Sequence, residues 1–214
     1  MKCVIGELHG GCSDAVSVRT KNFELKSDSA ILSQERDKET FAEKLSEWCG
    51  TRDFELLYRG TRDGFGANDF HSKCDNKGKT LVLIKNTSEH IFGGFASISW
   101  TSPSSNGCNH KQAPDSFIFT LTNMHGIKPT KFPLKDENTT DAVCHDKDYG
   151  PSFGGGNGSH DIGISSGSNS NTESWSSFPG SYNNTSGKGK SIFSSNTSNN
   201  HFKVQEIEVF KVNF

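Results

Sequence analysis

The stretch FELLYRGTRDGFGANDFHSKCDNKGKTLVLIKNTSEHIFGGFASISW, from Phe54 to Trp100, decides the fold of this chain. A short apolar strand over Phe54–Arg59 runs into a turn rich in arginine, aspartate and glycine. A compact helix follows, and then two more apolar strands, Thr80–Lys85 and Ile91–Trp100. Two strands joined by a short polar turn predict a hairpin, and no helix of about 10–15 residues separates them. This order favours antiparallel sheets and excludes a doubly wound α/β sheet.

One amphipathic helix is expected before these strands. Phe41, Leu45 and Trp48 recur at helical spacing and form an apolar stripe, which predicts a helix over 35–49. Gly50 follows at the position where helices commonly end on a glycine. We expect this helix to pack on the core through its apolar stripe.

Further strands are expected in the second half of the chain. Residues 116–122 alternate phenylalanine and leucine with polar residues, which indicates a half-buried strand. The last apolar stretch, 202–210, slips its alternation near Gln205 and predicts a β-bulge there. Together these elements predict an α+β fold that is mainly β: a two-sheet antiparallel β-sandwich flanked by two or more short helices.

Composition and charge limit the class of protein. The 214 residues suit one domain, which we place at 28–214 after an N-terminal extension over 1–27, with long Ser/Asn/Gly-rich surface loops at 166–200. The net charge of −2 gives no basic surface for nucleic acid. The sequence contains no run of about 18 apolar residues, so no transmembrane segment is expected. The N-terminus lacks an apolar stretch typical of a signal peptide. We expect a soluble, cytoplasmic protein.

The cysteines are expected to be free thiols. Their spacings are wide, and a chain of this length can build a core without disulfides. No CxxC pair occurs, so neither a zinc site nor a thioredoxin-type site is predicted. The six residues are Cys3, Cys12, Cys49, Cys74, Cys108 and Cys144.

His71 and Cys74 are the weak candidates for catalysis. They lie three residues apart on a helix predicted to open at Asn68 or Asp69, but two ligands do not make a zinc site. Phe70 and Cys74 share a helix face, which favours a buried thiol beside a surface histidine. A redox-active or enzymatic protein that uses Cys74 with His71 stays open as an alternative.

The turn after the first strand carries the densest charge cluster. Arg59 and its neighbours Arg62 and Asp63 stand at a strand end, where we expect an ion pair with Glu206 or Glu208 of the last strand. Loops on a rigid sandwich often carry binding function, so this turn and the glycine cluster near 153–161 are the predicted contact surface. The predicted binding residues are Arg59, Arg62, Asp63, Gly64, Phe65, Phe153, Gly154, Gly155, Gly156 and Asp161.

The glycine cluster and the acidic loops suggest two other kinds of site, one for a nucleotide and one for Ca²⁺. The glycine cluster lacks the spacing of a dinucleotide fingerprint and precedes a strand, so a nucleotide cofactor is not expected. Acidic loops could bind Ca²⁺ through oxygen ligands, although their spacing matches no EF-hand. A Ca²⁺-responsive binding module is therefore a second alternative. Its candidate ligands are Asp146, Asp148, Asn157 and Asp161.

Five residues are expected to have structural roles. Gly93 and Gly94 interrupt an apolar strand and predict a bulge or a close backbone contact. Trp100 ends that strand, and Glu206 and Glu208 are the expected partners of the charged turn.

Six segments of the chain resemble, in family order, the TLDc domain of oxidation-resistance proteins. The resemblance runs from Ser29 to Phe210 and implies a two-sheet sandwich with flanking helices. It also implies a non-enzymatic protein-interaction domain, because TLDc proteins are associated with resistance to oxidative damage and several bind and regulate the vacuolar proton-pumping ATPase. Such a partner would place the protein at endomembranes as a peripheral component. The matching segments are Leu56–Phe65, Phe70–Lys85, Ile91–Trp100, Ser116–Asn123, Phe153–Ser165 and Glu206–Phe210.

Overall fold

A six-stranded antiparallel sheet forms the centre of the protein. The computed structural model describes residues 24–136, 139–155 and 159–214. The strands of the sheet are β1 (Phe54–Arg59), β2 (Thr80–Asn86), β3 (Ile91–Ala96), β5 (Phe117–Thr120), β6 (Thr130–Pro133) and β11 (Val204–Val212). Their order is β1-β11-β2-β3-β5-β6, so the last strand lies inside the sheet, between β1 and β2.

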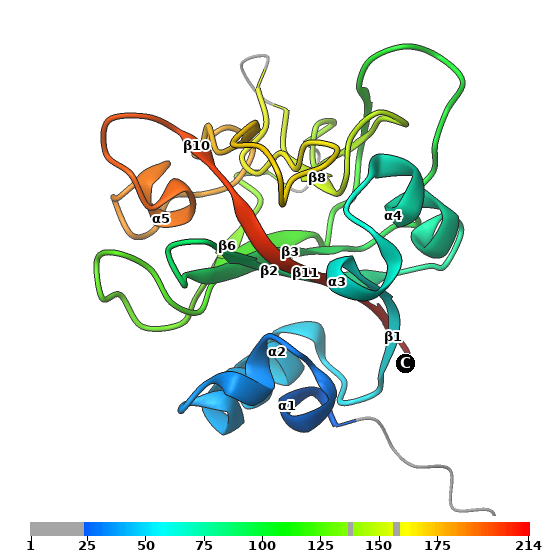
Figure 1. Cartoon of the computed structure of the whole chain (residues 1–214). Coiled ribbons are helices and arrows are strands. Elements are labelled where there is room, and N and C mark those ends of the chain that lie inside the picture. The colour runs from blue at the N-terminus through cyan, green and yellow to red at the C-terminus, as the bar shows by residue number, and fades with distance from the viewer. Residues whose placement is uncertain (1–23, 137–138, 156–158) are drawn as a thin grey trace, which may run out of the picture.

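Layers of different kinds cover the two faces of this sheet (Figure 1). One face carries two small antiparallel sheets, formed by β4 (Asn109–Lys111), β7 (Val143–His145) and β8 (Ser152–Phe153), and by β9 (Ser174–Trp175) and β10 (His201–Phe202). The short helix α5 (Ser191–Ser194) lies on the same side. The other face carries α1 (Leu25–Asp28), the 3₁₀ turn Leu32–Gln34 and α2 (Lys38–Cys49). The prediction of a mainly β sandwich flanked by helices is confirmed.

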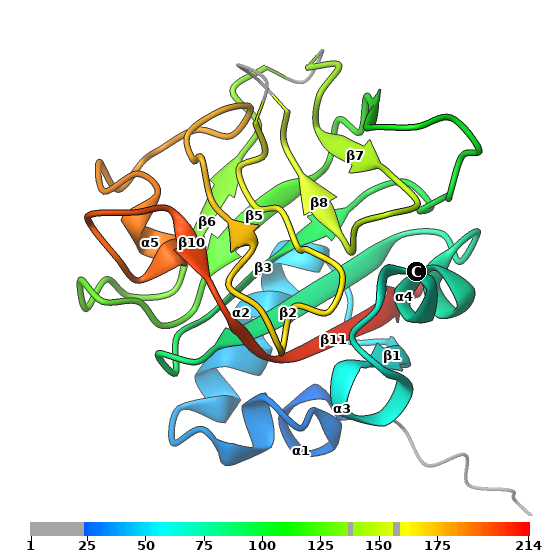
Figure 2. The same ribbon diagram turned by 45° about the horizontal axis from the view of Figure 1, so that its top comes forward.

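Two more helices follow β1 at one edge of the sheet. They are α3 (Gly60–Asp63) and α4 (Ala67–Cys74), and Figure 2 shows them beside the ends of β1 and β11. The helix α4 begins at Ala67, slightly before the predicted start. Its apolar face packs on Tyr58 and Trp100 through Phe70.

The core consists of two clusters, one on each face of the large sheet. The strand β2 divides its side chains between them: Val82 and Ile84 face the small sheets, whereas Leu81 and Leu83 face α2. All four side chains are fully buried. A strand without polar alternation is therefore covered on both sides, as its continuous apolar run predicts.

The last strand and the ends of α2 follow the local sequence signals in most respects. The bulge in the last strand is confirmed, because the register of β11 against β2 shifts between Val204 and Glu206. Gly50 ends α2 in the left-handed conformation at φ 74°. The helix begins at Lys38, after its predicted start at residue 35, because Glu35 is extended and separates α2 from the 3₁₀ turn Leu32–Gln34.

Gly93 and Gly94 pair regularly with both neighbouring strands, so there is no bulge at these residues. A Cβ atom at Gly94 would lie 2.6 Å from Cζ of Phe153, and one at Gly93 would meet the carbonyl oxygen of Val82. The alternative prediction of a close contact is the correct one.

The polar segment 166–200 is more buried than predicted. Phe178, Tyr182, Ile192 and Phe193 all belong to the core cluster on the small-sheet side. Serine hydroxyls in the segment find partners inside the fold; that of Ser181 donates to the carbonyl of Asp141 at 2.9 Å. Buried aromatic side chains therefore fix this Ser/Asn/Gly-rich segment to the core, and its buried polar groups are paired.

The prediction of free cysteines was wrong for one pair. Cys108 and Cys144 form a disulfide that joins the start of β4 to β7. The three residues directly after Cys108 form β4. Cys49 and Cys74 are free and buried. Cys3 and Cys12, like most of the predicted extension 1–27, lie outside the described residues.

Candidate functional site

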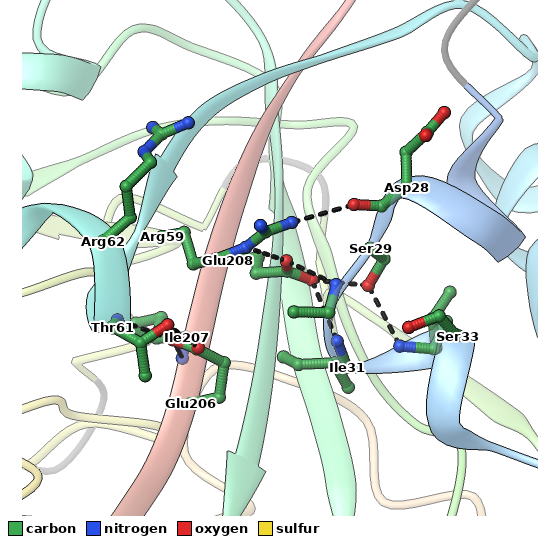
Figure 3. Close-up of polar contacts among 12 residues, drawn as sticks. Asp28, Ser29, Ile31, Ser33, Arg59, Thr61, Arg62, Glu206, Ile207 and Glu208 are labelled. Carbon is green, nitrogen blue, oxygen red and sulfur yellow. Dashed lines mark hydrogen bonds and ion pairs between the residues drawn. The ribbon is translucent and has the colours of Figure 1, made fainter.

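The charged turn after β1 is fixed to the last strand by an ion pair. Arg59 ends β1, and its Nε lies 2.7 Å from Oε1 of Glu208 on β11 (Figure 3). The same guanidinium donates through Nη2 to the carbonyl oxygen of Asp28 at 2.8 Å. The predicted pairing of this turn with the last strand is therefore present, and it reaches the first helix as well.

Glu208 is the centre of this network. Its side chain is fully buried, and besides Arg59 it accepts hydrogen bonds from the Ser29 hydroxyl and from the backbone N–H of Ala30 at 2.9 Å. The N–H of Ile31 approaches at 3.5 Å. A buried carboxylate is tolerated when such donors replace water. Glu208 consequently ties the helical layer, β1 and β11 together.

Glu206 supports the turn directly. It lies two residues before Glu208, on the same side of the strand, and is also buried. It accepts hydrogen bonds from the hydroxyl and the backbone N–H of Thr61, the latter at 3.1 Å. Glu206 therefore holds the α3 turn directly, and Glu208 holds Arg59, the residue just before it (Figure 3).

The outer side of the turn carries Arg62. Its Nη2 lies 2.7 Å from Oδ2 of Asp63 and donates to the carbonyl of Leu57 at 2.9 Å. The hydrogen bonds from Arg62 hold the pKa of Asp63 below its usual value. The Arg62 side chain is 46% exposed, so its position is fixed while part of its guanidinium faces solvent.

Gly64 and Phe65 connect α3 to α4. Gly64 has φ 105°, and its carbonyl accepts the Tyr58 hydroxyl at 2.6 Å. The carbonyl of Phe65 accepts the N–H of Gly167 at 2.9 Å, and the Ser166 hydroxyl accepts the N–H of Ala67 at 3.1 Å. The turn thus continues into the loop at 166–170. We name the exposed residues of both segments the α3–α4 surface: Thr61, Arg62, Asn68, Ser166, Asn169 and Ser170.

The described part of the glycine cluster does not form a surface. Phe153, Gly154, Gly155 and Asp161 are all buried. The ring of Phe153 packs on Gly94 and Trp100. Their prediction as contact residues was wrong, because the Phe153 ring fills the core and the residues beside it are buried with it. Gly156 lies outside the described residues.

Asp161 has a structural role at the end of this cluster. Its carboxylate accepts the backbone N–H of Gly180 and that of Ser181, the latter at 2.8 Å. Burial raises the pKa of Asp161 to about 6, although these hydrogen bonds act in the opposite direction. Asp161 thereby fixes the chain at 180–181 to the segment after β8.

His71 and Cys74 are both buried, so the prediction of a surface histidine was wrong. The Nδ1 of His71 lies 2.8 Å from the Asp75 carboxylate, and Nε2 lies 2.9 Å from the carbonyl oxygen of Asp146. Both ring nitrogens therefore lie against acceptor oxygens. Burial raises the pKa of Cys74 far above the value of a reactive cysteine. The pair serves packing between α4 and its neighbours.

Trp100 joins the same core. Its indole N–H donates to the Thr80 hydroxyl at 2.8 Å, and its ring meets Phe70 and Phe153 edge-on. The structural role expected for this residue agrees with its full burial.

The acidic residues proposed for Ca²⁺ have other contacts. Asp146 accepts the N–H of Asp148 at 3.0 Å, and Asp148 pairs with Lys147 at 2.9 Å. Together with the buried Asp161 they form no cluster of candidate ligands in the described part of the chain. Asn157 lies outside that part.

A different cluster was missed by the sequence reasoning. Across the described residues, Cys108, Cys144 and His160 are the His, Cys, Asp and Glu side chains that meet closely enough to hold a metal ion. Their positions, 36 residues apart for the two cysteines, match no short metal-binding motif. Only the pairing of β4 with β7 brings them together.

Comparison with known families gives one match. The family model described as TLDc domain matches residues 25–213, which is nearly the whole chain. A comparison with curated proteins finds no match. Within the described ranges, no helix has both the length and the apolar character needed to cross a bilayer.

Proposed function

The chain belongs to the TLDc domain family, and on that premise we propose that it is a non-enzymatic domain that binds a protein partner through the α3–α4 surface. The observation that carries this proposal is that two buried carboxylates anchor this segment: Glu206 holds the α3 turn, and Glu208 holds Arg59 just before it. A contact loop that is already ordered loses little conformational entropy on binding. Arg62 presents a partly exposed guanidinium on this surface, and arginine is enriched in protein interfaces.

We infer that the partner is the vacuolar proton-pumping ATPase, which several TLDc proteins are reported to bind, and that the binding contributes to protection against oxidative stress. The domain would act in the cytoplasm, at the peripheral part of the ATPase. The exposed arginine of the α3–α4 surface suits an acidic patch on one subunit.

The test is a direct binding experiment with purified vacuolar ATPase. The wild-type domain should sediment with the enzyme and change its rate of ATP hydrolysis. Arg62→Glu should weaken binding about tenfold or more, equivalent to about 1.4 kcal/mol, because it reverses a charge in the contact. Arg52→Glu is the matched control, since Arg52 is exposed on the separate loop between α2 and β1.

Two results would contradict the proposal. The first is a wild-type domain that neither binds the ATPase nor alters its activity. The second is equal weakening by Arg62→Glu and Arg52→Glu, which would indicate a nonspecific charge effect instead of a contact through the α3–α4 surface.

A further inference from the structure

Two cysteines and two histidines meet at the three-stranded sheet. Cys108 precedes β4, and His110 on β4 stands directly opposite Cys144 on β7 in the antiparallel register. His160 follows β8 in the chain and also lies close to both sulfurs. Four side chains with soft or nitrogen donors thus converge from three separate segments.

The distances bring three of these donors within the range of one ion, and His110 lies beside them. The sulfurs of Cys108 and Cys144 and a ring nitrogen of His160 all lie within 4.8 Å of one another. The Nδ1 of His110 lies 3.4 Å from Sγ of Cys108, and the two imidazole rings are 6.1 Å apart at their centres. A tetrahedral zinc site needs ligand atoms roughly 3.3–3.8 Å apart, given Zn–S bonds of about 2.3 Å and Zn–N bonds of about 2.0–2.1 Å. Small side-chain movements would meet this requirement.

The surroundings of His160 match those of a metal ligand. Its Nδ1 lies 2.9 Å from the carbonyl oxygen of Gly154, which can only accept a hydrogen bond. The proton must therefore be on Nδ1, and the lone pair is on Nε2. Zinc-bound histidines are commonly oriented by such a backbone hydrogen bond from the nitrogen that does not bind the ion.

Gly155 leaves the space that His110 occupies. A Cβ atom at this position would collide with Cε1 and Nδ1 of the His110 ring. The imidazole lies over the backbone of Gly155, beside Cys108. His110 is exposed, so its ring is free to adjust toward a bound ion.

We propose that Cys108, Cys144, His160 and His110 bind a Zn²⁺ ion when the disulfide between the two cysteines is reduced. Two thiolates and two neutral imidazoles are a common ligand set for structural zinc. The two thiolate charges balance the charge of the ion, so a half-buried site carries no net charge. The disulfide occupies both sulfurs and excludes the ion, and the two forms are therefore alternatives at one site.

The change between the two forms has a defined balance. A phosphine reduces the disulfide with one molecule of water and gives two thiols and the phosphine oxide. Zn²⁺ then replaces one proton on each thiol, so two protons are released for each ion bound.

The experiment uses the full chain, reduced with a phosphine under argon, with zinc titrated against a chromogenic chelator. One Zn²⁺ should bind per chain. Cobalt in place of zinc should give the intense visible bands of a tetrahedral site and a thiolate-to-cobalt charge-transfer band. The unreduced chain is the first control: it has the same sequence and should bind neither metal.

Variants identify the ligands. Loss of a direct ligand in Cys108→Ser, Cys144→Ser or His160→Ala should weaken zinc binding beyond the roughly 10–100-fold expected for loss of an outer partner. His201→Ala is the matched control, because His201 is exposed and outside the cluster, and it should bind zinc normally. Circular dichroism establishes that each variant is folded. Cys108→Ser and His160→Ala alter half-buried positions, so they remain informative if the buried Cys144→Ser variant does not fold.

The proposal is overturned if the reduced chain binds no zinc, or if cobalt gives only the weak bands of an octahedral, sulfur-free site. Normal binding by folded Cys108→Ser and His160→Ala would also overturn it, because the metal would then be held elsewhere. In those cases the two cysteines serve only as a disulfide.

Discussion

At the scale of single residues, the buried carboxylates of β11 determine how the parts of the chain meet. Glu208 connects β11 to Arg59 and to the backbone after α1, segments separated by about 150–180 positions in the sequence. Glu206 connects the same strand to Thr61. Alternation alone would place apolar residues at these buried positions. The charges are retained where they fix the N-terminal layer and the α3 turn.

Replacement of Glu208 by alanine should strongly destabilise the fold. The change removes the acceptor of Nε of Arg59, whose side chain is 22% exposed, and the acceptor of the Ala30 N–H. Removing one partner of a buried ion pair costs about 3–5 kcal/mol, and we expect about 3 kcal/mol because Arg59 can reach water. Urea unfolding measures the loss. Glu55→Ala on the exposed side of β1 is the control and should change stability by at most about 0.5 kcal/mol; a similar small value for Glu208→Ala would refute the account.

The stability contribution of Asp161 should depend on pH. Its pKa in the folded protein is about 6, above the ordinary value of 3.8, so the unfolded chain loses this proton at a lower pH than the folded one. The contribution is therefore most favourable below about pH 4 and declines as the pH rises through 6, by about 3 kcal/mol for a shift of roughly two units.

The comparison with Asp161→Asn isolates this effect, because other titrating groups cancel between the two proteins. The difference in unfolding free energy, wild type minus variant, should fall as the pH rises from about 4 to 7. Denaturant titrations at several pH values measure it. A difference that is constant with pH would show that Asp161 titrates normally in the folded state.

At the scale of elements, glycines allow the small sheets to approach the large one. Gly94 on β3 leaves room for the Phe153 ring from β8, and Phe153 in turn reaches Trp100. This contact joins the two β layers of the sandwich at its centre. It also explains why a segment rich in glycine is buried instead of forming a surface loop.

Gly94→Ala should destabilise the protein by about 1–3 kcal/mol, the usual cost of an overpacked core. The added methyl group would lie 2.6 Å from the Phe153 ring and force it to move. The same substitution in a Phe153→Leu background should cost clearly less, because the smaller side chain leaves space for the methyl group. Thermal unfolding of the wild type, the two single variants and the double variant measures the coupling energy between positions 94 and 153. Equal costs in both backgrounds would mean that the ring is not the obstacle.

The elements differ in how far the sequence predicts them. The apolar run at Phe54–Arg59 predicted both ends of β1. The continuous apolar run from Thr80 predicted β2. Both strands carry a strong local pattern. β4, with the sequence NHK, has no such pattern. It forms only because β7 lies beside it, so its strand, the disulfide and the cysteine–histidine cluster depend on contacts between distant segments.

The candidate site was predictable only in part, because some of its features have a local sequence signal and others depend on contacts between distant segments. The charged turn and its pairing with the last strand follow from charge at a strand end. The burial of Phe153 and Asp161 does not follow from local sequence, because glycine-rich segments are typical of both surface loops and close packing.

At the scale of the whole molecule, the large sheet is covered on both faces. A partner can therefore reach only the edges of the sheet and the loops. The α3–α4 surface lies next to β1, the outer strand on one side of the sheet. It combines ordered backbone with exposed polar side chains. The structure thus offers a contact region that does not require the core to rearrange.

Hydrogen–deuterium exchange of the domain, alone and bound to purified vacuolar ATPase, tests the central claim most directly. The account predicts slower exchange in the bound state at α3, the start of α4 and residues 166–170, with little change in α2 or at β6. Protection confined to another face, such as α2 or β6, or no protection at saturating ATPase, would contradict binding through the α3–α4 surface.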